Sequence, residues 1–209
     1  MSVRTIRIVS VAALAGLMSL TAPAHAQRAA QGPPDWPCVQ RLVPDLAWGT
    51  IWTGPSIEEL EEAWYRDPET RRIVRAAASR DTAQDEAIER VRRYAESIAE
   101  DREEKLTQLF AGLFEVISRE RTQTIDAILR YSRGQVRQLE RVGAIVDRLE
   151  EARADADADP AEVERIEHEL HWERRVFEDR LAALRVLCMQ PYLLEERLSR
   201  MVRAIRAEF

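Results

Sequence analysis

Apolar residues recur every three or four positions from Ser56 to the C-terminus, which is typical of amphipathic helices. Proline and capping signals mark where these helices begin: a capping box at Ser56–Glu59, and a proline at the first helical position in Asp67–Pro68. These signals predict helices at residues 57–66, 68–80, 160–188 and 191–207, with a long helical stretch at 83–155. The pattern therefore predicts an all-α chain folded as a small helical bundle.

The stretch from 83 to 155 contains no proline. As one helix it would be about 110 Å long at 1.5 Å per residue, which exceeds the size of a compact domain of this length. We therefore expect at least one break. A second capping box at Asp101–Glu104 and a slip of the apolar phase near residues 119–122 are the two candidates.

A heptad-like seam follows in the second half of this stretch, and residues 163–188 carry a matching apolar face. The first seam consists of Ile125, Ile128, Ser132, Gln135, Leu139, Val142, Val146 and Leu149. The second consists of Val163, Ile166, Leu170, Phe177, Leu181, Leu184 and Cys188. The short acidic segment 152–159 suits a turn, so we expect a long antiparallel helical hairpin. Polar Ser132 and Gln135 favour closure within one chain, but the sequence leaves the oligomeric state open.

Residues 1–26 have the features of a secretory signal peptide. Two arginines precede thirteen apolar residues, too few to span a bilayer, and the small residues Ala24 and Ala26 mark a cleavage site. The mature chain should begin at Gln27 and work in the periplasm or be secreted. No later segment of the sequence is apolar enough to span a membrane.

The mature N-terminus differs in composition from the rest of the chain. Residues 27–35 have little to bury and are predicted to form a flexible tail. Residues 36–55 are rich in proline and tryptophan and are predicted to be irregular. We expect Trp36, Trp48 and Trp52 to cover one end of the bundle as a hydrophobic lid; the alternative is that they form a pocket for a ligand or substrate.

Only two cysteines are present, Cys38 near the mature N-terminus and Cys188 near the C-terminus. In an oxidising compartment such an isolated pair is expected to form a disulfide. The alternative is two unpaired thiols.

Charge and motifs exclude several function classes. Without the two arginines of residues 1–26, the chain has 29 basic against 37 acidic residues, a net charge of −8, which disfavours nucleic-acid binding. No serine elbow or glycine-rich phosphate loop is present, so we expect no cofactor and no catalytic residue. Glu164, His168 and His171 share one helical flank and form a weak metal candidate, for which a solvated charged face is the favoured interpretation.

The last predicted helix carries arginines at intervals of three residues, including Arg197, Arg200 and Arg203. They could form a basic surface for anionic lipid or an acidic partner. Intervening acidic residues favour the simpler interpretation of a helix with one packed and one solvated face.

The block Pro34–Arg41, together with Ile51–Pro55, resembles the mature N-terminus of small secreted bacterial proteins of unknown function. The resemblance implies export and no particular chemistry. Together these features predict a non-catalytic interaction or accessory module whose partner is another exported or envelope protein. The alternative is a periplasmic ligand carrier or enzyme that uses a pocket near the tryptophans.

Overall fold

The computed structural model describes residues 33–58, 60 and 63–209, and this part of the chain is an all-α helical bundle. The predicted signal peptide and most of the predicted tail lie outside the described residues. Within these residues the elements are a 3-10 turn η1 (Trp48–Thr50) and five helices: α1 (Ala63–Arg66), α2 (Pro68–Ala78), α3 (Gln84–Ser97), α4 (Arg102–Ala154) and α5 (Pro160–Arg206). No helix of the described residues is long and apolar enough to cross a membrane.

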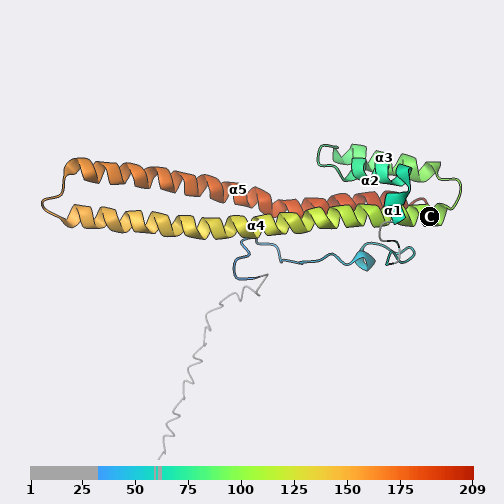
Figure 1. Ribbon diagram of the computed structural model, residues 1–209, viewed down its shortest axis with the longest axis horizontal. Coiled ribbons are helices and arrows are strands. Elements are labelled where there is room, and N and C mark those ends of the chain that lie inside the picture. Colours follow the sequence, from blue (N-terminus) through green and yellow to red (C-terminus); the bar gives the residue numbers. More distant parts are fainter. Residues whose placement is uncertain (1–32, 59, 61–62) are drawn as a thin grey trace, which may run out of the picture.

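The two long helices α4 and α5 lie side by side and run in opposite directions (Figure 1). The turn between them ends at Asp159, whose carboxylate accepts a hydrogen bond from the Ala161 N–H at 2.9 Å, and Pro160 occupies the first helical position. At 53 residues, α4 is about 80 Å long. The molecule is therefore elongated along this axis.

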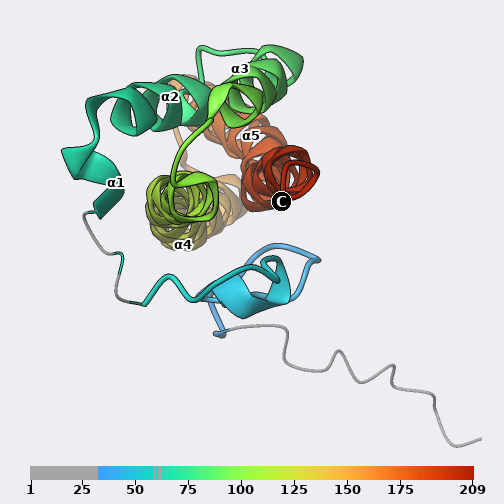
Figure 2. The same ribbon diagram turned by 90° about the vertical axis from the view of Figure 1, so that its right-hand side faces the viewer.

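The small helices α2 and α3 cover one side of α4 and α5 near the C-terminus, and α1 lies beside them (Figure 2). The main core forms there, around the fully buried Leu106, Phe110, Leu198 and Met201. We call this part the head: α1–α3 with residues 102–121 and 194–206. The rest of the two long helices, residues 122–154 and 160–193, is the arm.

Several predicted helix boundaries are wrong. The break expected near residues 119–122 is absent, because Arg121 and Thr124 fill the apolar gap there and are themselves buried against the rest of the fold. A break does occur before Arg102, but Asp101 makes no capping hydrogen bond and has a left-handed φ of 51°. The helices predicted at 160–188 and 191–207 are one helix, α5, with Pro191 inside it. Proline removes one backbone hydrogen bond from a helix, and the packing of α5 on both sides of Pro191 outweighs that loss.

The first predicted helix, 57–66, is also shorter than expected. Among the described residues of this range, Ala63–Arg66 is helical, and the Ser56 hydroxyl accepts the Glu58 N–H in a local turn.

The buried line of α4 in the arm differs from the predicted seam at two points, of which one is Ile145, buried in place of the predicted Val146. Gln138 is buried and the predicted Leu139 is 57% exposed, so the spacing shortens by one residue there. Such a three-residue step locally changes the winding of one helix about another. Gln138 remains inside because it bonds across to α5, where its amide donates to Glu173, while Gln135 donates to the Phe177 carbonyl at 3.2 Å. The centre of the arm is thus held by polar groups.

Candidate interaction surface

The N-terminal segment, residues 33–58, runs along the side of the long helices opposite α2 and α3 (Figure 2). One end is tied down by a disulfide between Cys38 and Cys188, the pair that the sequence predicts to be joined, with an S–S distance of 2.04 Å. Trp36 packs beside this bond, against Ile128 and Leu184. The disulfide therefore attaches this segment to the base of the arm.

A second attachment is made by Arg121, a residue that is not among the candidates predicted from the sequence. Its guanidinium donates to the carbonyl oxygens of Val43 at 2.6 Å and Pro44 at 2.9 Å, and it pairs with Glu195 of α5. Because the side chain is buried, its charge needs polar partners in place of water, and these three acceptors supply them. Only the apolar phase slip around residue 121 marked this position in the sequence.

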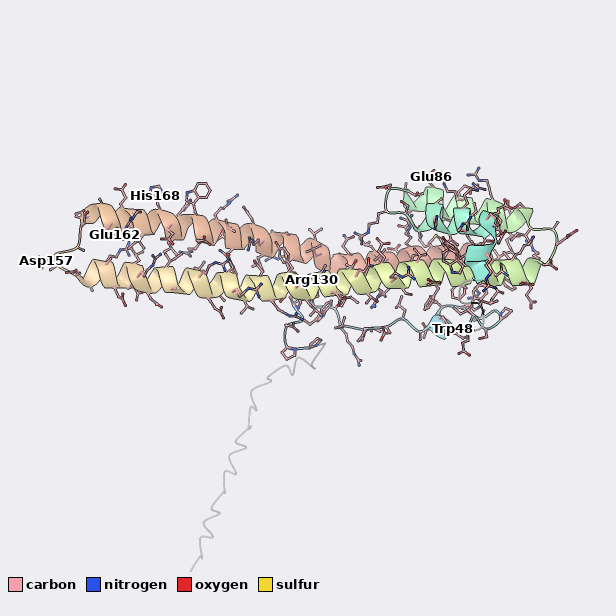
Figure 3. All side chains as sticks on the ribbon, in the orientation of Figure 1. Trp48, Glu86, Arg130, Asp157, Glu162 and His168 are labelled. Atoms are coloured by element: carbon pink, nitrogen blue, oxygen red, sulfur yellow. A yellow bond between two sulfur atoms is a disulfide. The ribbon has the colours of Figure 1, made fainter. Side chains whose placement is uncertain are left out.

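The three tryptophans of the candidate surface lie in three different environments and do not form one pocket. Trp36 lies by the disulfide, and Trp52 is buried and stacked on Phe110 at 4.2 Å between ring centroids. Trp48 is partly buried at the side of the head, on the N-terminal segment (Figure 3). The three rings therefore do not form one lid over an end of the bundle, as we expected. They lie at separate places along the long helices.

Trp48 does border a cleft of about 520 Å³ in the head. Among the described residues its apolar lining includes Ile57, Leu60, Trp64 and Phe114. At its polar edge, the Trp64 indole N–H donates to Glu115 at 2.8 Å, and the buried Ser118 hydroxyl has no hydrogen-bond partner among the described residues.

The predicted basic surface on the last helix is divided between two roles. Arg197 is a structural residue: it donates to the carbonyl oxygens of Ala77 and Ser79 at the end of α2, and burial lowers its pKa. Arg200 lies near Asp85 of α3 at 3.8 Å and lines a shallow cleft with Arg203. These arginines do not form a continuous free surface.

The weak metal candidate Glu164, His168 and His171 lies on exposed positions of the arm. Among the described residues, no group of three histidine, cysteine, aspartate or glutamate side chains converges as a metal site would require. His168 projects from α5 away from α4, so it marks the outer side of the arm (Figure 3).

One turn after His168, a second line, apolar at five of its seven positions, runs along this outer side of α5. Its positions alternate by four and three residues and are Trp172, Val176, Asp179, Ala183, Val186, Gln190 and Leu193. We call this set the outer stripe. Trp172 is 64% exposed, Val186 is 63% exposed and Val176 is 37% exposed. Because α5 also faces α4 with Ile166 and Leu184, it carries two packing faces, and the described residues cover only one of them along the arm.

The same line continues into the head, where it is covered. The next positions at the same spacing within the head are Arg197, Arg200 and Ala204. Arg197 bonds the end of α2, Arg200 lies near α3, and Ala204 is buried. In the head, α3 therefore packs on this face of α5, beside α2, which packs on α4 and is bonded at its end by Arg197. This two-helix layer ends where the arm begins (Figure 1).

The first turn of α2 is fixed by a small polar cluster. Asp67 accepts hydrogen bonds from the N–H and hydroxyl of Thr70, and the Thr70 hydroxyl lies 2.6 Å from that of Tyr94 on α3. These bonds lower the pKa of the Asp67 carboxyl below its ordinary 3.8, with the Thr70 hydroxyl the largest cause. Burial raises the pKa of Tyr94 above 10.0. The cluster joins α2 to α3, so it stabilises the covering layer of the head.

Comparison with known proteins finds no matching family model, no similar curated protein and no similar solved structure. The functional argument therefore depends on the surface itself.

Proposed function

We propose that this chain is an exported, non-catalytic interaction module whose arm binds a helix of another polypeptide. The observation that supports this most strongly is the outer stripe, a heptad-spaced apolar line that the fold covers in the head and leaves exposed along the arm. Exposed apolar positions at helical spacing are the usual anchors of helix-to-helix recognition.

Export is part of the same proposal. It is supported by the predicted signal peptide and by the Cys38–Cys188 disulfide, since such bonds persist in oxidising compartments. The partner would then be another exported or envelope protein chain in the periplasm or outside the cell.

The proposal is tested by cross-linking cells that export a tagged chain and recovering the adducts. Trp172→Glu and Val186→Glu should each remove the adducts that the unaltered chain gives, because a charge on the stripe must be desolvated on binding. The matched control is Val136→Glu, which places the same charge on α4 at an apolar residue that is 55% exposed and outside the stripe. Adducts that survive both stripe variants, or that Val136→Glu removes equally, would refute the proposal.

A ligand carrier is the second candidate function, and the cleft beside Trp48 is the observation that favours it. Its volume and aromatic lining suit a small apolar molecule with one polar group for Ser118. A thermal-shift screen of apolar ligands on the mature protein would test this function. A stabilising ligand should lose its effect in Phe114→Ala and keep it in Val136→Ala.

A further inference from the structure

We propose that the helix that covers the outer stripe is the outer stripe of a second copy of this chain, packed antiparallel. The proposal rests on the function proposed above and names its partner. The two chains would form a four-helix bundle from their arms, with one head at each end.

The first argument is length. The layer formed by α2 and α3 ends at Arg197, which bonds the last carbonyls of α2, and the uncovered part of α5 extends from there to Pro160 at the tip. This interval is about 55 Å long at 1.5 Å per residue. A second arm in the opposite direction has the same length, so its tip would lie against the first head and fill the missing layer.

The second argument concerns direction. A parallel pair would bring the two heads to the same end, where α3 and the end of α2 already occupy the face of α5 that carries the stripe. The two covering layers would then collide. An antiparallel pair instead places each head opposite the tip of the other copy, and its contact is symmetric, as is usual for dimers of identical chains.

The third argument is the pairing of side chains. When each tip reaches the other head, the two-fold axis passes near Asp179. Trp172 of one copy then lies opposite Val186 of the second copy, and Val176 lies within one residue of the position opposite Ala183. Each pair sets a larger side chain against a smaller one, which helps two helices approach closely.

The charge at the axis makes the proposal specific. Asp179 would lie near Asp179 of the second copy, and each carboxylate has Arg175 of its own chain at 3.4 Å. The arginines reduce the repulsion without removing it. The dimer should therefore be weakened by its own central acid.

Sedimentation of the oxidised mature chain, residues 27–209, should show a concentration-dependent equilibrium between one and two chains. Trp172→Glu should weaken association at least tenfold, whereas Val136→Glu should leave it unchanged. Asp179→Asn should tighten it by about two- to fivefold, because the like charges at the axis are removed. Circular dichroism of each variant confirms that helix content is retained.

Single introduced cysteines then test the direction, with the native disulfide confirmed intact by mass. Asp179→Cys should cross-link to itself on mild oxidation. Trp172→Cys should not, because the two Trp172 positions of an antiparallel pair are about 20 Å apart along the axis. Cross-linking of both variants would indicate a parallel pair, and cross-linking of neither in a dimer would indicate another surface; either result overturns the proposal.

A chain that stays monomeric at every concentration also overturns it. If the stripe variants still abolish adducts in cells, that outcome leaves the proposed function intact and assigns the stripe to a different protein. If they do not, both proposals fail.

Discussion

Removal of the Cys38–Cys188 disulfide should both destabilise the fold and release a defined piece of the N-terminal segment. The bond closes a loop with a sequence separation of 150 residues. In the chain-entropy account, closing a loop of this size lowers the free energy of folding by about 5 kcal/mol at most. In Cys188→Ser, the melting temperature should therefore fall by on the order of 10 °C.

The structure predicts where the released piece ends. Arg121 still holds the carbonyls of Val43 and Pro44, and Trp52 still stacks on Phe110, so only residues before Val43 should come free. Exposed Arg41 lies within that piece and is a trypsin site. Helix content should hardly change, because no helix precedes Cys38 among the described residues.

Limited trypsin digestion of oxidised and Cys188→Ser proteins checks this directly, with peptide masses read without reductant. Cleavage after Arg41 should be faster in the variant and should release the terminal peptide, which the disulfide retains in the parent chain. The double variant Cys38→Ser with Cys188→Ser is the control for effects of a free thiol and should match the single variant. Equal cleavage rates and equal melting temperatures would refute this account of the N-terminal segment.

Four further predictions follow from other parts of the chain. Asp67→Ala should lower the free energy of unfolding by about 1 kcal/mol at pH 7. Because the pKa of the Asp67 carboxyl is lowered in the folded state, this difference should vanish as the pH falls below 3.8, the ordinary pKa of the group. Urea titrations of both proteins at several pH values measure it. Arg121→Lys should lower the free energy of unfolding by about 2–3 kcal/mol, because a single ammonium cannot bond all three acceptors of the buried guanidinium. Arg119→Lys, at an exposed position, should change it by almost nothing in the same titration. Gly112→Ala should destabilise the fold by about 1–3 kcal/mol, because the added Cβ would lie 2.7 Å from Val74 and 2.8 Å from Trp64. Gly134→Ala should instead stabilise α4 by about 0.5–1 kcal/mol, because its Cβ would have only Arg137 nearby, at 3.9 Å. Mass spectrometry of the exported protein should give Gln27 as its first residue; a retained Met1 would contradict the signal-peptide prediction.

The sequence predicted the all-α bundle and the cysteine pair because both depend on local or simple signals. Helical spacing defines amphipathic faces, and two cysteines allow only one intramolecular pair. The continuity of α4 was not predictable in this way. Its apolar phase slips near residue 121, and a buried arginine fills the gap only because distant carbonyls at Val43 and Pro44 satisfy it.

The outer stripe was overlooked although its spacing is visible in the sequence. Asp179 and Gln190 interrupt it, and the stronger seam through Ile166 and Leu184 explains the helix by itself. Only the structure shows that the same line is covered by α3 and the end of α2 in the head and exposed in the arm. The arginines of α5 misled the prediction of a basic surface for a related reason. The guanidinium of Arg197 donates to a carbonyl oxygen at the end of α2, so it is not free to bind a partner.

The most direct test of the arm as a binding surface is a photo-cross-linking scan in cells, with a photoreactive residue placed at successive positions of α5 from 172 to 187. If the outer stripe binds a helix, adduct yield should peak at 172, 176, 179, 183 and 186 and fall at 174, 178 and 185, which lie on other faces of the helix. The mass of the adduct identifies its partner, and the self-association proposed here predicts twice the chain mass. A yield without helical periodicity, or no adduct at any position, would contradict the assignment of the outer stripe as a binding surface.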